Sequence, residues 1–206
     1  MLFYVKNKAV LSLAAVLVIA LVSLLLKHIL GLSWNLHIGG VTVALFFLCL
    51  GLILASDLIL SILLVVIFHT AFIRLWMEMA GYFSRQRLYD VLAGGLLASG
   101  EEMFFRGVLL QYMVQTLGWD SYYAVAISAA AFALFHVIWN KRLALFSVWA
   151  FWEGVMLGAA YLYTDSLPAV MAVHAAHDIA GFTLFFLQRR RGFLVVIQHP
   201  GFRVTR

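Results

Sequence analysis

Charged residues and cysteine are scarce in this sequence. Charged residues make up only 11% of the 206 residues, whereas 65% are hydrophobic, and Cys49 is the single cysteine. A soluble domain has about 25% charged and about 45–50% apolar residues. The composition therefore excludes an ordinary soluble domain and makes the lipid bilayer the expected solvent. One cysteine excludes an internal disulfide, and the sequence contains no visible internal repeat or low-complexity tract.

Long apolar runs fill most of the chain. At roughly 20 residues per crossing, the length accommodates six to eight membrane helices. We count seven spans, at about residues 9–30, 38–55, 58–76, 88–117, 121–139, 143–163 and 168–187. The sequence therefore predicts an all-α fold, a polytopic transmembrane helical bundle that forms a single integral-membrane domain over residues 1–206.

Three local patterns add detail to this bundle. Only Ser56 and Asp57 separate the second and third spans, which predicts a tight helical hairpin there. Residues 77–90 mix aromatic residues with arginines, as an interfacial segment does. The first half of the fourth span contains three glycines, which predict a kink or close packing against a neighbouring helix.

The basic residues lie at the ends of the apolar runs. The net charge of +5 is therefore interpreted as a topology signal from loops that face anionic lipid, and not as a nucleic-acid site. The connections on one predicted side hold Lys27, Arg85, Arg87, Lys141, Arg142 and the arginines at 189–191. Those on the other side hold Asp57, Asp120 and Asp165. This division predicts a cytoplasmic C-terminus, with residues 188–206 as a basic surface tail.

Two carboxylates and a guanidinium interrupt the fourth span. On insertion scales each ionised residue at the centre of a bilayer costs about 2.5–3.5 kcal/mol, so Glu101, Glu102 and Arg106 need partners. On a helix Glu102 and Arg106 share a face at i, i+4, which predicts a buried ion pair. Glu101 is rotated by about 100° and has no local partner, so we expect it to face a cavity. A packing network without chemistry is the alternative interpretation.

The later spans carry polar groups of their own. His136 lies in the fifth span, and His174, His177 and Asp178 occupy one face of the seventh at i, i+3, i+4. A lone membrane histidine is commonly a packing element, but a shared water-containing cavity accounts best for all of these groups together. Glu153, in the sixth span, is interpreted as a supporting residue or the partner of a basic loop residue. Residues 1–87 are thus predicted to form a wall and 88–187 the catalytic helices.

Three motifs follow one another in the second half of the chain: Glu-Glu-x-x-x-Arg at 101–106, Phe-x-x-x-His at 132–136 and His-x-x-x-Asp at 174–178. This ordered set resembles the CAAX protease and bacteriocin-processing family, also called Abi. That family comprises glutamic-type intramembrane endopeptidases and includes the type II CAAX prenyl endopeptidases. The resemblance covers about residues 88–187, and a myxosortase-like branch fits so compact a chain.

The resemblance implies catalytic roles. Glu101 corresponds to the catalytic glutamate and would accept a proton from a water that it holds with His136, and the hydroxide would attack the scissile carbonyl. Glu102 would pair with Arg106. The implied substrate is a peptide near the C-terminal tail of a membrane-associated protein, or a bacteriocin leader. The implied setting is a multi-pass protein of the bacterial cytoplasmic membrane, with no cofactor.

The third motif departs from the family pattern. Its last position is often asparagine, and here it is Asp178. His174 and residue 178 would stabilise the oxyanion, but an ionised carboxylate cannot donate a hydrogen bond. Either Asp178 is kept protonated by apolar surroundings, or it orients His174 or His177 and leaves donation to them.

Three other functions remain open for the same residues. Glu101, His136 and His174 are a possible two-histidine, one-carboxylate ligand set for a zinc-dependent protease. Acid and histidine chains in membranes also form proton relays in transporters, although the repeats typical of transporters are not visible. A non-enzymatic bacteriocin-immunity or binding protein could hold a peptide in the same groove.

Overall fold

The structure is a computed structural model that describes residues 8–37, 43–83, 85–138 and 144–190. Within these ranges the regular structure is helical and contains no strand, which confirms the all-α prediction. The described helices include three that are long and apolar enough to cross a membrane: α2 (Val43–Ile67), α6 (Ser121–Ile138) and α8 (Leu167–Arg190). α1 (Lys8–Ile29) contains a shorter apolar stretch. The chain is therefore a membrane protein, and seven crossings remain a prediction.

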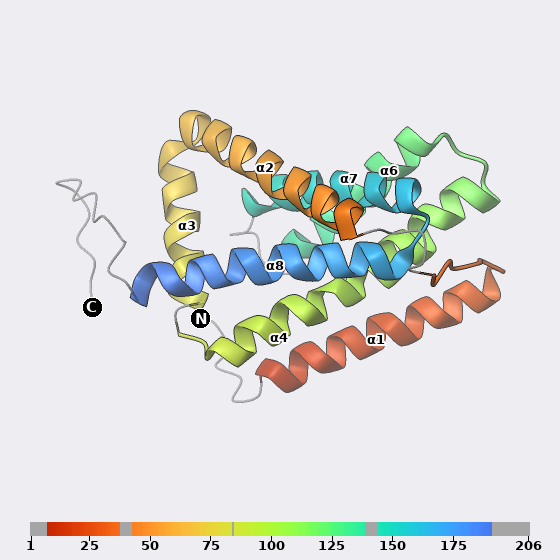
Figure 1. Cartoon of the computed structure of the whole chain (residues 1–206), viewed down its shortest axis with the longest axis horizontal. Helices are drawn as coiled ribbons and strands as arrows, with labels where there is room; N and C mark the ends of the chain where they lie inside the picture. Colours follow the sequence, from red (N-terminus) through yellow and green to blue (C-terminus); the bar gives the residue numbers. More distant parts are fainter. Residues whose placement is uncertain (1–7, 38–42, 84, 139–143, 191–206) are drawn as a thin grey trace.

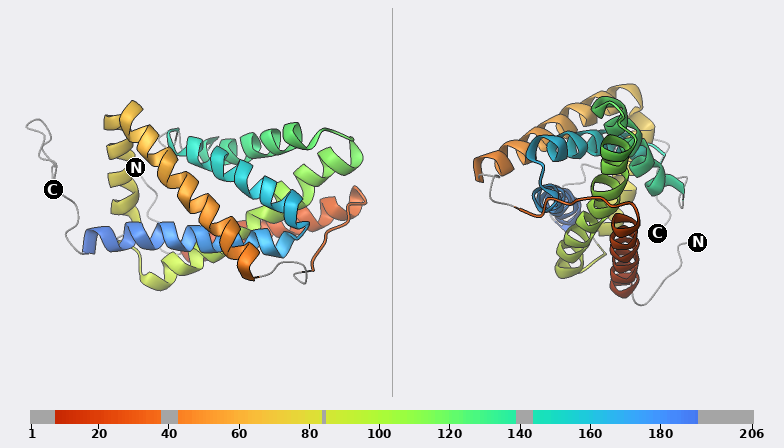
Figure 2. Two further views of the ribbon diagram at one scale, coloured as in Figure 1. Left: turned by 45° about the horizontal axis from the view of Figure 1, so that its top comes forward. Right: turned by 90° about the vertical axis from the view of Figure 1, so that its right-hand side faces the viewer.

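Two helix pairs form the body of the bundle. α4 (Leu88–Ala98) lies along α8, and α1 packs on the other side of α4 (Figure 1). α6 packs along α7 (Phe146–Thr164), and α7 contacts α8. α2 runs obliquely from α3 (His69–Phe83) to α8, as the turned view shows (Figure 2). α8 therefore contacts α2, α3, α4 and α7, and its His174 ring also meets the Phe132 ring of α6.

The predicted hairpin at Ser56 and Asp57 is wrong. α2 continues through both residues to Ile67, and the direction changes at Phe68, before α3. The Ser56 hydroxyl donates to the Ile53 carbonyl at 2.9 Å within the helix, and Asp57 Oδ2 lies 2.6 Å from His177 of α8. Asp57 therefore lies within a helix and not in a loop between spans, so it no longer indicates which side of the membrane a loop faces.

The segment predicted to be interfacial, residues 77–90, begins as the end of a helix, and its position at the membrane surface stays a prediction. Residues 77–83 belong to α3, which packs on α8 and runs across its direction (Figure 1). Phe83, at the end of α3, is buried against Val91 and Phe186. Its ring stacks on that of Phe182, with centroids 4.4 Å apart, so this part of the segment is held by aromatic packing.

The fourth span changes helical geometry along its length. After α4 come a 3₁₀ turn η1 (Ser99–Glu101), one turn of α-helix α5 (Glu102–Phe104) and two π-helical segments, η2 (Phe105–Leu110) and η3 (Tyr112–Thr116). Irregular turns redirect backbone carbonyls to side chains. The Phe105 carbonyl accepts from Ser128 at 2.9 Å, and the Gly107 carbonyl accepts from Trp34 at 2.6 Å. The kink or close packing predicted for the first half of this span takes the form of close packing of Gly95 against Ile179 of α8, and the irregular turns begin only at Ser99.

Two glycines allow helices to approach closely. A Cβ on Gly95 would lie 2.8 Å from the Ile179 nitrogen of α8, and one on Gly154 would lie 2.9 Å from the Ala129 Cα of α6. Neither position has room for a side chain, so glycine sets the spacing of α4 from α8 and of α7 from α6.

Several predictions fall outside the described residues. The expected span ends at Ile38, Trp139 and Leu143 lie there, as do the basic connection at 141–142 and most of the tail at 188–206. The division of the domain into residues 1–87 and 88–187 stays a prediction. Asp57 shows that the first part also reaches the polar cluster.

Replacing Gly154 by alanine should destabilise the bundle. The added methyl group would lie 2.9 Å from Ala129 and force α6 and α7 apart, and overpacking of this kind costs about 1–3 kcal/mol. Thermal unfolding of the purified protein in detergent measures the loss. Gly51→Ala in α2 is the matched control, because no described atom lies within 4 Å of its added Cβ. Equal unfolding midpoints for the two variants would contradict the close packing.

Candidate active site

A buried ion pair fixes the first half of the site. Arg106, in η2, donates from Nη1 to Glu102 Oε1 at 2.7 Å, and both side chains are fully buried. Arg106 Nη2 also donates to the Gly154 carbonyl of α7 at 2.9 Å. The guanidinium lies 4.9 Å from the centre of the Phe132 ring of α6. The predicted Glu102–Arg106 pair is therefore present, and it connects the fourth span to α6 and α7.

His174 joins this pair to α8. Its Nδ1 lies 2.7 Å from the Glu102 oxygen that Arg106 also contacts, and the imidazole is only 2% exposed. Its Nε2 faces two further carboxylates, with Glu153 Oε1 at 3.7 Å and Asp178 Oδ2 at 3.6 Å. Because a carboxylate paired with arginine can only accept, the Nδ1 of His174 carries the proton of that contact.

Glu101 and His136 form a separate pair. Glu101 Oε2 lies 3.8 Å from His136 Nε2, and this oxygen accepts no hydrogen bond from the described residues. His136 Nδ1 lies 2.9 Å from the Phe132 carbonyl. Since a carbonyl only accepts, Nδ1 must donate there, which leaves Nε2 unprotonated in the neutral imidazole. The Glu101 oxygen without a hydrogen bond and the unprotonated Nε2 of His136 thus face each other.

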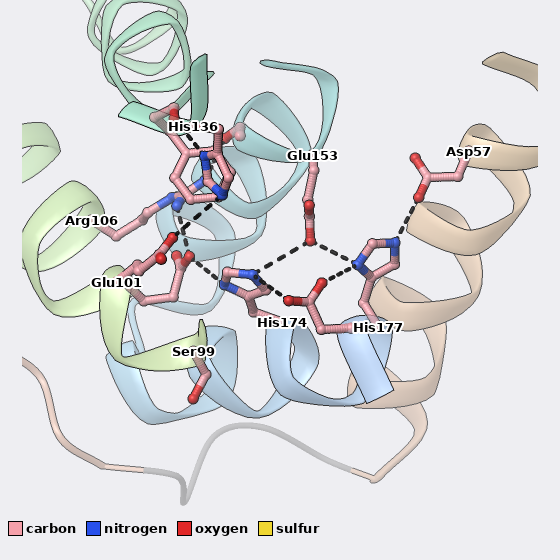
Figure 3. Close-up of polar contacts among 12 residues, drawn as sticks. Asp57, Ser99, Glu101, Arg106, His136, Glu153, His174 and His177 are labelled. Carbon is pink, nitrogen blue, oxygen red and sulfur yellow. Dashed lines mark hydrogen bonds and ion pairs between the residues drawn. The ribbon is translucent and has the colours of Figure 1, made fainter. Parts of the chain in front are cut away.

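His177 extends the cluster toward α2. Its Nε2 lies 2.6 Å from Asp57 Oδ2, and its Nδ1 lies 2.7 Å from Glu153 Oε1 and 3.3 Å from Asp178 Oδ1. These three carboxylates come from α2, α7 and α8 (Figure 3). Among the described residues, Glu153 therefore pairs with histidines inside the bundle.

The structure brings all seven predicted site residues into contact with another member of the set. They are Glu101 with His136, Glu102 with Arg106 and His174, and Asp178 with His174 and His177. Their catalytic and supporting roles stay predictions. Sequence reasoning missed Asp57, and for Glu153 it left open a supporting role or a pairing with a basic loop residue. An acid inside a long apolar run was the available signal for both.

The residues placed best to hold a metal ion differ from the predicted zinc set. In the described part of the chain, the histidine and carboxylate atoms that lie within 4.8 Å of one another belong to Glu153, His177 and Asp178. Of the expected trio, Glu101 and His136 are neighbours, whereas His174 is bonded to Glu102.

Residues 84–180 match the family model described as type II CAAX prenyl endopeptidase Rce1-like. These residues are an Rce1-like domain. The predicted resemblance to CAAX proteases is confirmed, while the myxosortase-like branch stays a prediction. No curated protein and no solved structure matches the chain in the corresponding comparisons.

The Rce1-like domain contains the seven predicted site residues, and Asp57 lies outside it. The family is one of proteases, so membership implies a peptide substrate and a reaction in a membrane setting. The Glu101–His136 pair and the Glu102–Arg106–His174 group both lie within the matched residues. These two groups are therefore the candidate site for the chemistry of the domain.

Replacing Arg106 by methionine should strongly destabilise the Rce1-like domain. Glu102 would become a buried charge without its cation, and breaking such a pair costs about 3–5 kcal/mol. The double variant Glu102→Gln/Arg106→Met removes both charges, so it should be less destabilised than the sum of the single variants. Unfolding measurements on the three variants form a double-mutant cycle. Strict additivity would show that the pair is not energetically coupled.

Proposed function

We propose that this protein is a glutamic-type intramembrane endopeptidase in which Glu101 and His136 activate a water molecule. The observation that carries the proposal is their separation of 3.8 Å, with an unpaired oxygen on one side and an unprotonated nitrogen on the other. Hydrogen bonds of about 2.8 Å from a single water can reach both atoms. The Rce1-like match supports peptide hydrolysis as the reaction.

In the proposed reaction the water oxygen attacks the carbonyl carbon of the scissile peptide bond. Glu101 takes one proton from the water, and His136 accepts a hydrogen bond from the other. The tetrahedral intermediate then collapses as the carbon–nitrogen bond breaks. Glu101 returns its proton to the leaving amine, so the enzyme ends in its starting state. No covalent intermediate is required.

His174 is proposed to stabilise the oxyanion. Its Nε2 is not committed to a hydrogen bond of normal length, and the imidazolium form is favoured by Glu102 on one side and by Glu153 and Asp178 on the other. Asp178 then acts as the orienting carboxylate. Its Oδ1 contacts His177 and its Oδ2 faces His174, which fits an acceptor better than a donor.

The proposed substrate is a peptide segment near the C-terminal tail of a membrane-associated protein. Four described helices carry long or shorter apolar stretches, so a substrate that is itself anchored in the bilayer reaches the site along the membrane. The proposed orientation has the C-terminus in the cytoplasm, on the basis of the basic residues at the segment ends. The bacterial cytoplasmic membrane is proposed from the resemblance to bacteriocin-processing proteases alone.

Replacing Glu101 by glutamine should abolish cleavage while the protein folds normally. Loss of a general base lowers a rate by about 10²–10⁴-fold, and glutamine keeps the shape of the side chain. Cells that express the wild type or Glu101→Gln can be compared by mass spectrometry of protein termini in the membrane fraction. Peptides that end at a new site should appear with the wild type only.

Glu78→Gln is the matched control for this experiment, because Glu78 is an exposed glutamate of α3 outside the cluster. It should give the wild-type set of termini. His136→Ala should reproduce the Glu101→Gln result. Wild-type cleavage by Glu101→Gln would remove the proposed base, and a peptide that accumulates intact without any cleavage by the wild type would favour the binding-protein alternative.

Replacing Asp178 by asparagine should lower turnover at least tenfold. The amide cannot balance the charge of His174, so the oxyanion donor would be lost, and one such donor is worth about 2.7–4 kcal/mol. Initial rates on a substrate found in the terminal-peptide experiment measure the effect. Retained turnover would instead assign Asp178 the role of a neutral donor.

A further inference from the structure

His177 has a carboxylate on each side of its ring. Asp57 Oδ2 lies 2.6 Å from Nε2, while Glu153 Oε1 lies 2.7 Å and Asp178 Oδ1 lies 3.3 Å from Nδ1 (Figure 3). A neutral imidazole has a single N–H, and an ionised carboxylate only accepts. One of the two sides is therefore left without a proton between its atoms.

Asp57 makes the shorter of the two histidine hydrogen bonds, so it takes the N–H of Nε2. Nδ1 then presents a lone pair to Glu153 and Asp178. Glu153 is only 7% exposed, and its Oε1 accepts no hydrogen bond from the described residues although Nδ1 is close. Two lone pairs that face each other at this distance require a positive species between them.

We infer that Glu153, His177 and Asp178 bind a divalent transition-metal ion. The ligand atoms of a tetrahedral zinc ion, with bonds of about 2.0–2.1 Å, lie about 3.3 Å apart. The separation from His177 Nδ1 to Asp178 Oδ1, 3.3 Å, equals that value, and Glu153 Oε1, at 2.7 Å, lies closer than the bound geometry requires. All three ligand atoms lie within 4.8 Å of one another. One imidazole with two carboxylates suits zinc, with manganese as the harder alternative.

Asp57 has the position of an orienting carboxylate for this site. Metal-binding histidines commonly donate their second N–H to a carboxylate, which fixes the tautomer and directs the other nitrogen to the ion. Asp57 belongs to α2, whereas Glu153 belongs to α7 and His177 to α8. The ion would thus link α7 to α8 and, through Asp57, engage α2, which lies outside the matched domain.

Charge balance favours an ion over a second proton on His177. Three carboxylates around an imidazolium leave two negative charges inside the bundle, whereas the same carboxylates around a neutral imidazole and a divalent ion leave one. Uncompensated charge is costly in a low-dielectric interior. The site is separate from the Glu101–His136 pair but shares Glu153 and Asp178 with the surroundings of His174. The inference therefore goes beyond the proposed activation of water and does not depend on it.

Zinc binding by the purified, tag-free full chain tests the inference. The protein in detergent is stripped with a chelator, dialysed against Zn²⁺, and analysed for bound metal, with Mn²⁺ in a parallel sample. The wild type should bind one zinc ion per chain, and His177→Ala should reduce bound zinc to background. Asp57→Asn should weaken binding by about 10–100-fold, as expected for an orienting residue.

His136→Ala is the matched control, because it removes a histidine of the neighbouring pair and should keep the zinc. Glu153→Gln preserves side-chain shape and tests the site if His177→Ala fails to fold, as judged by gel filtration. Absence of bound zinc and manganese in the wild type would overturn the inference. So would zinc that survives in both His177→Ala and Glu153→Gln, or zinc that is lost on His136→Ala.

Discussion

One carboxylate oxygen, Glu102 Oε1, joins the fourth span to α8. Glu102 Oε1 accepts from Arg106 at 2.7 Å and lies 2.7 Å from His174 Nδ1, with all three side chains buried. Buried charge is tolerated in a membrane bundle only when partners reach it, so the fourth span and α8 must meet at this point. Arg106 extends the constraint to α7 through the Gly154 carbonyl, where the absence of a side chain brings the helices together.

This arrangement explains why two adjacent glutamates differ. Glu102 is held through Oε1 by both Arg106 and His174, whereas Glu101, at the end of the 3₁₀ turn η1, faces His136 at 3.8 Å. The irregular turns around them depart from the regular i, i+4 pattern at the position where the two side chains diverge. π-helical turns inside helices are frequent at functional sites. Here the irregular turns begin after α4, which is packed on α8, and continue into η2, which carries Arg106.

The sequence predicted what depends on local spacing. Composition sufficed for the helical membrane fold, and the separation of four residues sufficed for the Glu102–Arg106 pair. The prediction failed for Asp57, because a Ser-Asp dipeptide in an apolar run also fits a turn. The histidine that hydrogen-bonds Asp57 lies 120 residues away in the sequence. Glu153 was undecided for the same reason, since its partners belong to another helix and no local periodicity reports them.

Through Asp57, the first half of the chain contributes a side chain to the polar cluster. The family match begins at residue 84, and a set of helices that only supported it would need no acid facing the site. Yet Asp57 is held 2.6 Å from His177, whose other nitrogen faces Glu153 and Asp178. Removing Asp57 would alter which nitrogen of His177 carries the proton, and with it the environment of Asp178. α2 therefore contributes a charged side chain to the site. Asp178, at the motif position that is often asparagine in the family, belongs to a histidine–carboxylate network that Asp57 of α2 completes.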